Sequence, residues 1–178
     1  MTTSEAIRVT LAGAGAPWCP ASSHRPPRMS VPFNRDARRT CDSGPMTSES
    51  RHLSEQINRP AAQVYDYASN PAHLPEWAPG LGRSVEQVDG QWFADSPMGR
   101  VSFAFVPRND YGVLDHDVTL PSGDIIYNPM RVTKNGSGSE VVFTLRRLPG
   151  MNDEDFERDA KSVAADLARL RQVLEAAQ

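Results

Sequence analysis

Cysteine is nearly absent from this chain of 178 residues, and both cysteines, Cys19 and Cys41, lie within the first 45 positions. The rest of the chain has no disulfide available, so its stability must come from an apolar core. No window reaches the roughly 18 consecutive apolar residues that a membrane-spanning helix requires. A content of 39% hydrophobic and 23% charged residues is typical of a soluble globular domain. We expect a cytoplasmic protein with no membrane span.

Positive charge is scarce after the first 45 residues. Residues 1–45 contain six arginines and three acidic residues, a net charge of +3. Since the whole chain carries −3, residues 46–178 carry −6. Binding to nucleic acid through its phosphates requires clustered lysine and arginine, so we expect no nucleic-acid partner.

Motifs for metal binding and nucleophilic catalysis are missing as well. The four histidines (His24, His52, His73 and His116) have neither H-x-H nor H-x-x-x-H spacing. The sequence contains no G-x-S-x-G elbow, P-loop, H-E-x-x-H or C-x-x-C motif. We expect no metal site and no cofactor, and no residue establishes that a reaction occurs.

Residues 1–45 differ in composition from the rest of the chain. They contain six prolines, several glycines and serines, and no sustained period of 2 or 3.6. Such a segment cannot bury enough apolar surface to offset the entropy of ordering, so we predict a disordered or over-extended N-terminal segment. Residues 46–178 are expected to form one domain.

Alternation of polar and apolar residues predicts a series of strands. Asp89-Gly90 separates two such segments, and this dipeptide is a strong signal for a two-residue hairpin. The expected strands cover residues 52–58, 84–88, 91–94, 100–106, 112–120, 124–133 and 140–147. One polar and one apolar face on each strand is typical of an antiparallel sheet that is covered on one side.

Two short helices and one long helix are expected around these strands. Pro60 and Asn70-Pro71 each predict the start of a short helix, and Pro79-Gly80 ends the second. Asn152 is a good N-cap for a helix whose first turn is acidic. Apolar residues then recur at spacings of three and four, which predicts a long amphipathic helix packed over the sheet. These residues are Phe156, Ala160, Val163, Leu167, Leu170 and Leu174.

The order of these elements is that of the helix-grip fold. The segments NRPAAQVYDY (58–67) and NPAHLPEW (70–77) resemble the opening of the START-like or SRPBCC superfamily. This superfamily includes polyketide cyclase/dehydrase-like proteins and lipid-transfer domains, and in many members a tryptophan matching Trp77 ends the second short helix. The resemblance covers roughly residues 51–176. It implies an α+β fold in which a curved antiparallel sheet of about six or seven strands and the long helix enclose a cavity.

Apolar and aromatic residues line the cavity in this fold, with a few polar groups among them. A solid domain would use the same residues as core, and both alternatives stay open for individual members of the set. The residues expected to contact a ligand are Trp77, Phe103, Phe105, Leu114, His116, Val118, Asn128, Met130, Arg131, Phe143, Phe156, Ala160 and Val163.

His116 and Arg131 are the candidates for chemistry within this set. His116 shares a strand face with apolar neighbours, so it would face the cavity and there position an oxygen or act as general acid or base. The alternative is a buried neutral histidine with a backbone partner. Arg131 follows Pro129, whose missing N–H predicts a bulge or a sheet edge, so the direction of Arg131 stays open.

Asp115 and Asp117 flank His116 on the same expected strand. Adjacent strand residues point to opposite faces, so the pattern predicts no His–Asp dyad. We expect both carboxylates in solvent, paired with Arg100 or Arg146.

Three functions fit these expectations. The first is a carrier or binding protein for a small hydrophobic or aromatic molecule, without catalysis. The second is a cyclase- or dehydratase-like enzyme acting on a polyketide-type or aromatic substrate, in which His116 or Arg131 polarises an oxygen and the cavity positions the chain. The third is a protein-interaction or co-chaperone-like domain. The sequence leaves the ligand and the oligomeric state open, a homodimer included.

Overall fold

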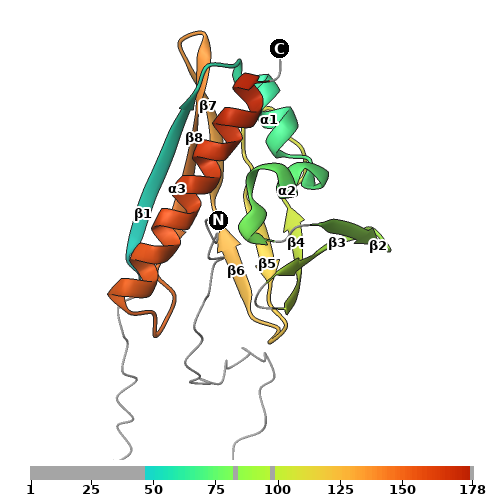
Figure 1. Ribbon diagram of the computed structural model, residues 1–178, viewed down its shortest axis with the longest axis vertical. Coiled ribbons are helices and arrows are strands. Elements are labelled where there is room, and N and C mark those ends of the chain that lie inside the picture. The colour runs from blue at the N-terminus through green and yellow to red at the C-terminus, as the bar shows by residue number, and fades with distance from the viewer. Residues whose placement is uncertain (1–46, 82–83, 97–98, 177–178) are drawn as a thin grey trace, which may run out of the picture.

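The computed structural model describes residues 47–81, 84–96 and 99–176 (Figure 1). The prediction for residues 1–45 lies outside this part of the chain. The first elements are β1 (Ser50–Ile57), α1 (Ala61–Ala68), the 3-10 turn η1 (Pro71–His73), α2 (Leu74–Trp77) and the 3-10 turn η2 (Pro79–Leu81). They are followed by β2 (Val85–Val88), β3 (Gln91–Ser96), β4 (Gly99–Phe105), β5 (His116–Thr119), β6 (Ile125–Asn128), β7 (Met130–Asn135), β8 (Gly138–Arg146) and α3 (Asp153–Ala176).

The strands form two antiparallel sheets, ordered β1-β8-β7 and β2-β3-β4-β5-β6. Two backbone hydrogen bonds connect the sheets, from Leu114 N to Met130 O (2.9 Å) and from Val132 N to Gly112 O (2.8 Å). The sheets therefore continue into one another as a bent surface, with β5 and β6 at the bend (Figure 1). The predicted α+β helix-grip fold, with its short helices after the first strand and its long C-terminal helix, is confirmed.

Proline 129 accounts for the difference in strand number. The sequence predicts one strand over residues 124–133, but the structure ends β6 at Asn128 and starts β7 at Met130. Proline has no N–H for a ladder bond, so the strand breaks where the sheet bends. Eight strands result within the described residues, against the six or seven expected.

Glycine 112 lies on the other side of the junction, opposite Val132 of β7. Its backbone φ is +70°, and a Cβ at this position would overlap the carbonyl oxygen of Val132. Only glycine combines the left-handed conformation with such a close backbone approach. Regular pairing of this chain segment therefore begins only at His116, four residues later than the alternating pattern predicts.

The hairpin at Asp89-Gly90 and the long helix form as predicted. Both hairpin residues have positive φ, +50° and +83°, as a two-residue turn between twisted strands requires. The side chain of Asn152 accepts a hydrogen bond from Asp155 N (2.8 Å) and so caps α3. All six apolar residues of the predicted stripe are buried. The first short helix begins at Ala61 rather than at Pro60, which is its N-cap.

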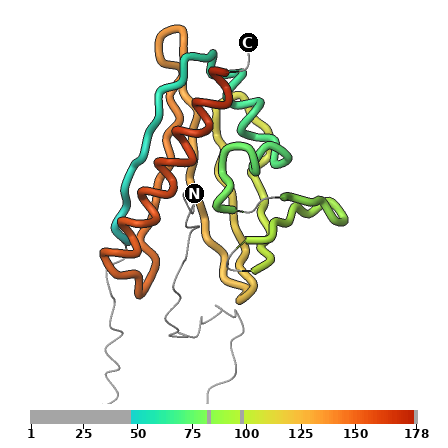
Figure 2. The backbone as a smooth tube through the Cα atoms, in the orientation of Figure 1, coloured from blue at the N-terminus to red at the C-terminus, as the bar shows by residue number. Residues whose placement is uncertain are grey.

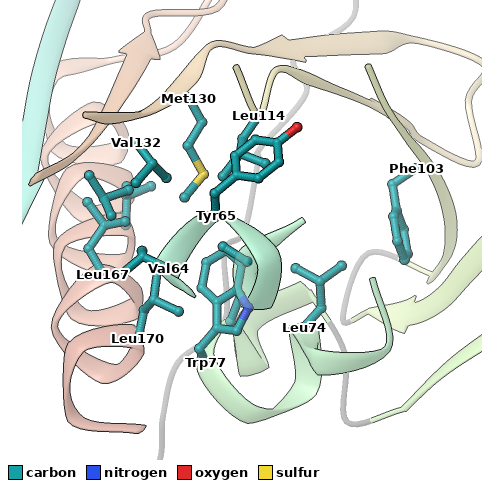
Figure 3. Close-up of a cluster of buried hydrophobic side chains, with 14 of the residues drawn as sticks. Val64, Tyr65, Leu74, Trp77, Phe103, Leu114, Met130, Val132, Leu167 and Leu170 are labelled. Carbon is teal, nitrogen blue, oxygen red and sulfur yellow. The ribbon is translucent and has the colours of Figure 1, made fainter. Parts of the chain in front are cut away.

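The long helix α3 crosses the sheet diagonally and contacts β1 on one side and α2 on the other (Figures 1 and 2). Its 24 residues span ~36 Å at 1.5 Å per residue. The space between α3 and the sheet is solid in one half. There Val64 and Tyr65 of α1 pack with Met130, Val132 and the α3 residues Leu167 and Leu170 (Figure 3). The other half, toward the start of α3, is hollow.

Candidate functional site: a cavity between the sheet and α3

The hollow half is a cavity of about 760 Å³. Its walls come from α2, η2, β5, β6, β8 and residues 159–167 of α3. Exposed residues at Thr47–Glu49, Ile125 and Pro149-Gly150 border it, so it opens to solvent beside the loop that precedes α3. This volume lies within the range of about 300–1,000 Å³ that is usual for sites of small molecules.

Most of the cavity wall is apolar. Buried members include Leu74, Trp77, Ala78, Val118, Leu120, Val163 and Leu167. The short proline-bounded helix α2 contributes Leu74 and Trp77, and Trp77 is the nearer of the two to α3 in Figure 3. An apolar molecule that enters such a space loses contact with water along its whole length, which favours binding by roughly 25 cal/mol per Å² of apolar area.

His116 is the polar group of the cavity that comes from β5. Its Nδ1 lies 3.0 Å from Leu114 O, and because a carbonyl only accepts, Nδ1 carries the proton. Burial lowers the pKa of His116, and the Leu114 bond and Asp117 oppose this shift only in part. The ring packs against Phe105 at 4.8 Å and Phe143 at 6.2 Å between centroids. His116 is therefore a fixed, neutral imidazole whose Nε2 is an acceptor.

Trp77 places a hydrogen-bond donor in the same wall. Its Nε1 is buried and has no acceptor within the described residues. A buried donor without a partner costs about 1–3 kcal/mol, so a ligand oxygen that reached it would be stabilised. Asn128 also lines the cavity, and its side-chain amide donates to Ile126 O at 3.4 Å.

Asp159 on α3 lines the cavity although the sequence pattern does not mark it as a ligand-contacting residue. It is 5% exposed, and its Oδ1 has no hydrogen-bond partner within the described part of the chain. Burial raises the pKa of Asp159 to about 6, although Arg158 opposes the shift. A signal for this position exists, because residue 159 lies three residues after Phe156 and four before Val163, on the apolar face of the helix.

Asp166 lies two turns further along the same face of α3 and also lines the cavity. Burial raises the pKa of Asp166 to about 7, with Arg169 opposing the shift. The Arg169 side chain is itself bound to α2, because its Nε donates to Glu76 O at 2.5 Å. The cavity thus contains two carboxyl groups that change charge near neutral pH.

Asp115 corrects the prediction that both acidic neighbours of His116 lie in solvent. Asp117 is exposed, but Asp115 is 5% exposed and accepts a hydrogen bond from Met130 N at 2.9 Å. It also accepts from Tyr127 Oη and pairs with the Arg131 guanidinium. The expected alternation fails here because residues 112–115 do not form a regular strand. Arg100 pairs instead with Glu86, at 2.5 Å.

Arg131 lies outside the cavity wall. Its neighbours in β7, Met130 and Val132, point into the core, so Arg131 points to the opposite face and reaches Asp115. It holds the bend of the sheet together. The side chain of Arg131, whose direction the sequence left open, therefore points away from the cavity.

The structure brings six of the thirteen expected ligand-contacting residues together around the cavity. They are Trp77, His116, Val118, Asn128, Phe143 and Val163. Leu114 and Met130 belong to the solid core beneath α1 (Figure 3). Phe103 packs between Trp92 and Phe105, with ring centroids 6.4 Å and 6.5 Å apart, respectively. Phe156 is covered by the guanidinium groups of Arg51 and Arg147, and Ala160 is buried on α3 without lining the cavity.

Neither a metal-binding group nor a membrane-spanning helix is found among the described residues. No group of three or more histidine, cysteine or acidic side chains is arranged to hold a metal ion there. None of the helices in the described ranges combines the length and hydropathy that crossing a membrane requires.

The fold and cavity define a helix-grip protein of the START-like (SRPBCC) superfamily. A family model described as polyketide cyclase / dehydrase and lipid transport matches residues 50–175, and the chain belongs to this family. No curated protein sequence matches the chain.

Solved structures show the same fold at low sequence identity. An uncharacterized protein from Bacillus thuringiensis is 15% identical, with a TM-score of 0.57 and coverage of 70% of this chain and 98% of that chain. DynU16, from the dynemicin biosynthetic locus, is 13% identical, with a TM-score of 0.56 and coverage of 71% and 47%. The Aha1 dimer from Colwellia psychrerythraea is also 13% identical, with a TM-score of 0.56 and coverage of 71% and 96%. Identities at this level establish the fold alone.

Proposed function

We propose that the protein binds a small hydrophobic or aromatic molecule in the cavity between the sheet and α3, as a carrier or binding protein. The observation that supports this most strongly is the cavity itself, because an apolar space of about 760 Å³ is left open beside an otherwise packed core. Close packing is the default in protein interiors, and filling this space with larger side chains would stabilise the fold. Membership of a family that includes lipid transport agrees with this function.

A specific feature favours a second candidate function, a cyclase- or dehydratase-like enzyme that uses the same cavity. Burial raises the pKa values of Asp159 and Asp166 in the wall to about 6 and about 7, and the neutral imidazole of His116 supplies a proton acceptor. Positioned acids and bases of this kind catalyse enolisation and dehydration of carbonyl compounds. On the first function these groups orient the ligand, and on the second they also transfer protons.

Occupation of the cavity can be tested with the uncharged dye Nile red and the substitution Val163→Trp. Val163 lines the cavity, so an indole at this position occupies the space that the dye needs. The matched control is Ala164→Trp, which places the same side chain on the exposed face of α3. We expect Val163→Trp to weaken dye binding at least tenfold and Ala164→Trp to leave it unchanged. Equal binding by both variants would contradict the proposed function.

The carrier and enzyme alternatives differ in the effect of His116→Ala. A carrier would show an altered affinity and nothing else. An enzyme would lose turnover of a poly-β-keto thioester while it still bound the cyclised product. A protein whose partner binds the outer face of the sheet would be indifferent to both His116→Ala and Val163→Trp.

A further inference from the structure

The polar groups that face the cavity from α3 and β5 are hydrogen-bond acceptors, whereas the donors Trp77, Arg146 and Arg147 come from α2 and from around the end of β8. The carboxyl groups of Asp159 and Asp166 face it from α3, and the imidazole of His116 faces it from β5. The hydrogen bond to Leu114 O uses the one proton of the neutral His116 ring, so Nε2 can only accept. A ligand that brought donors to the α3 and β5 side of the cavity would therefore meet several acceptors there.

Asp159 has a carboxylate oxygen that lacks a hydrogen-bond donor within the described residues. The residue is 5% exposed, and its Oδ1 is buried without a hydrogen bond in the described part of the chain. The neighbouring cation on its own helix, Arg158, is paired with Asp155. A buried carboxyl group in this state is stabilised either by a proton or by a donor that arrives from elsewhere.

The other charged groups around the cavity have partners of their own. The Arg147 guanidinium pairs with Glu49 at 2.7 Å and with Asp153 at 2.8 Å. Arg146 is exposed at the end of β8 and lies over the Tyr127 ring, 5.8 Å from its centroid. Arg169 is held by Glu76 O on α2, and no hydrogen bond or ion pair to Asp166 occurs within the described residues. Neither carboxyl group in the wall therefore has a basic side chain bonded to it.

From this arrangement we infer that the acidic wall formed by Asp159 and Asp166 selects apolar ligands with a protonated amine and rejects ligands with a carboxylate. The inference rests on the proposed function and specifies its ligand class. An ammonium group donates up to three hydrogen bonds and brings the charge that an ionised carboxylate lacks. A ligand carboxylate would place a second negative charge beside the wall in an apolar space, which is unfavourable. Asp159 is the principal contact, because its Oδ1 has no hydrogen-bond partner within the described residues.

Three ten-carbon probes isolate the contribution of the polar end group. Decylamine, decanol and decanoate share one apolar chain, and their affinities are compared by isothermal titration calorimetry at pH 8, where both carboxyl groups are ionised. We expect decylamine to bind about tenfold more tightly than decanol, the factor that one charge-assisted hydrogen bond supplies, and decanoate to bind most weakly. At pH 5, where burial keeps both carboxyl groups protonated, decylamine should lose its advantage over decanol.

Conservative substitutions test which residues are responsible. Asp159→Asn keeps the shape of the side chain and removes the charge, so the preference for decylamine over decanol should fall about tenfold. Asp166→Asn should reduce it by a smaller factor. The matched control is Glu154→Gln, which removes a charge from the exposed side of α3 and should leave the preference unchanged.

The outcomes separate this inference from the proposed function. If decanol binds but decylamine binds no better, the acidic wall is not selective and the inference is wrong, while the proposed function stands. The same holds if the preference survives in the double variant D159N/D166N. If none of the three probes binds, both are wrong.

Discussion

Replacing Asp159 by asparagine should change the pH dependence of folding stability in a defined direction. The carboxyl group has a pKa of 3.8 in an unfolded chain, and burial raises it to about 6 in the folded protein. Between these values the folded state retains a proton that the unfolded state has lost. Folding stability from this group therefore falls as the pH rises from about 4 to about 6, and the loss persists above that pH.

The size of the effect follows from the shift in the pKa of Asp159. Each unit is worth about 1.4 kcal/mol, so a rise from 3.8 to about 6 corresponds to at most about 3 kcal/mol at pH 8. This value is an upper limit, because the cavity beside Asp159 opens to solvent, which screens the charge. Asparagine cannot ionise, so the Asp159→Asn protein should gain up to this amount relative to the native protein between about pH 4 and pH 8.

Urea unfolding followed by far-UV circular dichroism at five pH values from 4 to 8 measures this difference. Burying the asparagine amide adds a cost that does not depend on pH, so the slope of the difference is informative rather than its value at one pH. His116 has a lowered pKa and produces the opposite slope below its unfolded value of 6.5, but it is present in both proteins and cancels. A flat difference would refute the reasoning. A growing advantage of the native protein would show instead that Asp159 forms an ion pair.

Two further substitutions test the bend of the sheet, each by the free energy of unfolding in urea. Gly112→Ala should lower the free energy of unfolding by more than about 3 kcal/mol, because the added Cβ overlaps Val132 O. Gly123→Ala should lower it by only about 1 kcal/mol, because Gly123 has a similar positive φ but no atom within 4 Å of the added Cβ. Equal losses of stability would contradict the close backbone approach at Gly112. Asp115→Ala should lower the free energy of unfolding by about 2–4 kcal/mol, because the hydrogen-bond and ion-pair partners of Asp115 lose their acceptor. Asp117→Ala removes an exposed side chain and should change the free energy of unfolding by no more than about 0.5 kcal/mol. The reverse order would show that Asp115 is not the buried carboxylate.

Elements with a strong local signal could be predicted from the sequence. Asp89-Gly90 specifies its hairpin through backbone conformations that these two residues tolerate well, and Asn152 specifies the start of α3 through its capping oxygen. The apolar period of α3 predicts its buried face because a helix repeats every 3.6 residues regardless of what covers it. Such signals depend on neighbours in the chain.

The bend at Pro129 could be predicted only in part. The sequence identifies an interruption there, but residues 112–114, which pair with β7 just after it, lie more than ten residues earlier in the chain. This pairing interrupts the alternation ahead of β5, so Leu114, Asp115 and His116 are all buried in succession. Period-2 reasoning cannot predict this, because it assumes a regular strand throughout.

The acidic wall of Asp159 and Asp166 was not predicted, for a different reason. Charged residues on a helix are ordinarily assigned to solvent, and that rule holds for Lys161 and Arg169. Asp159 and Asp166 violate it because a cavity, rather than packed side chains, covers their part of α3. Their helical phase was readable, since each lies three residues after a buried apolar residue of the stripe. A charge on the apolar phase of a helix is therefore worth treating as a candidate site residue.

The proposed function requires a molecule to enter the space between β5, α2 and residues 159–167 of α3. Methyl-resolved nuclear Overhauser spectroscopy of the protein with decanol measures this directly. We expect contacts from the decanol chain to the methyl groups of Val118, Val163 and Leu167, which line the cavity, and none to Val64 or Val101, which are fully buried elsewhere. Contacts confined to exposed residues such as Val88 would show that the cavity does not receive ligands.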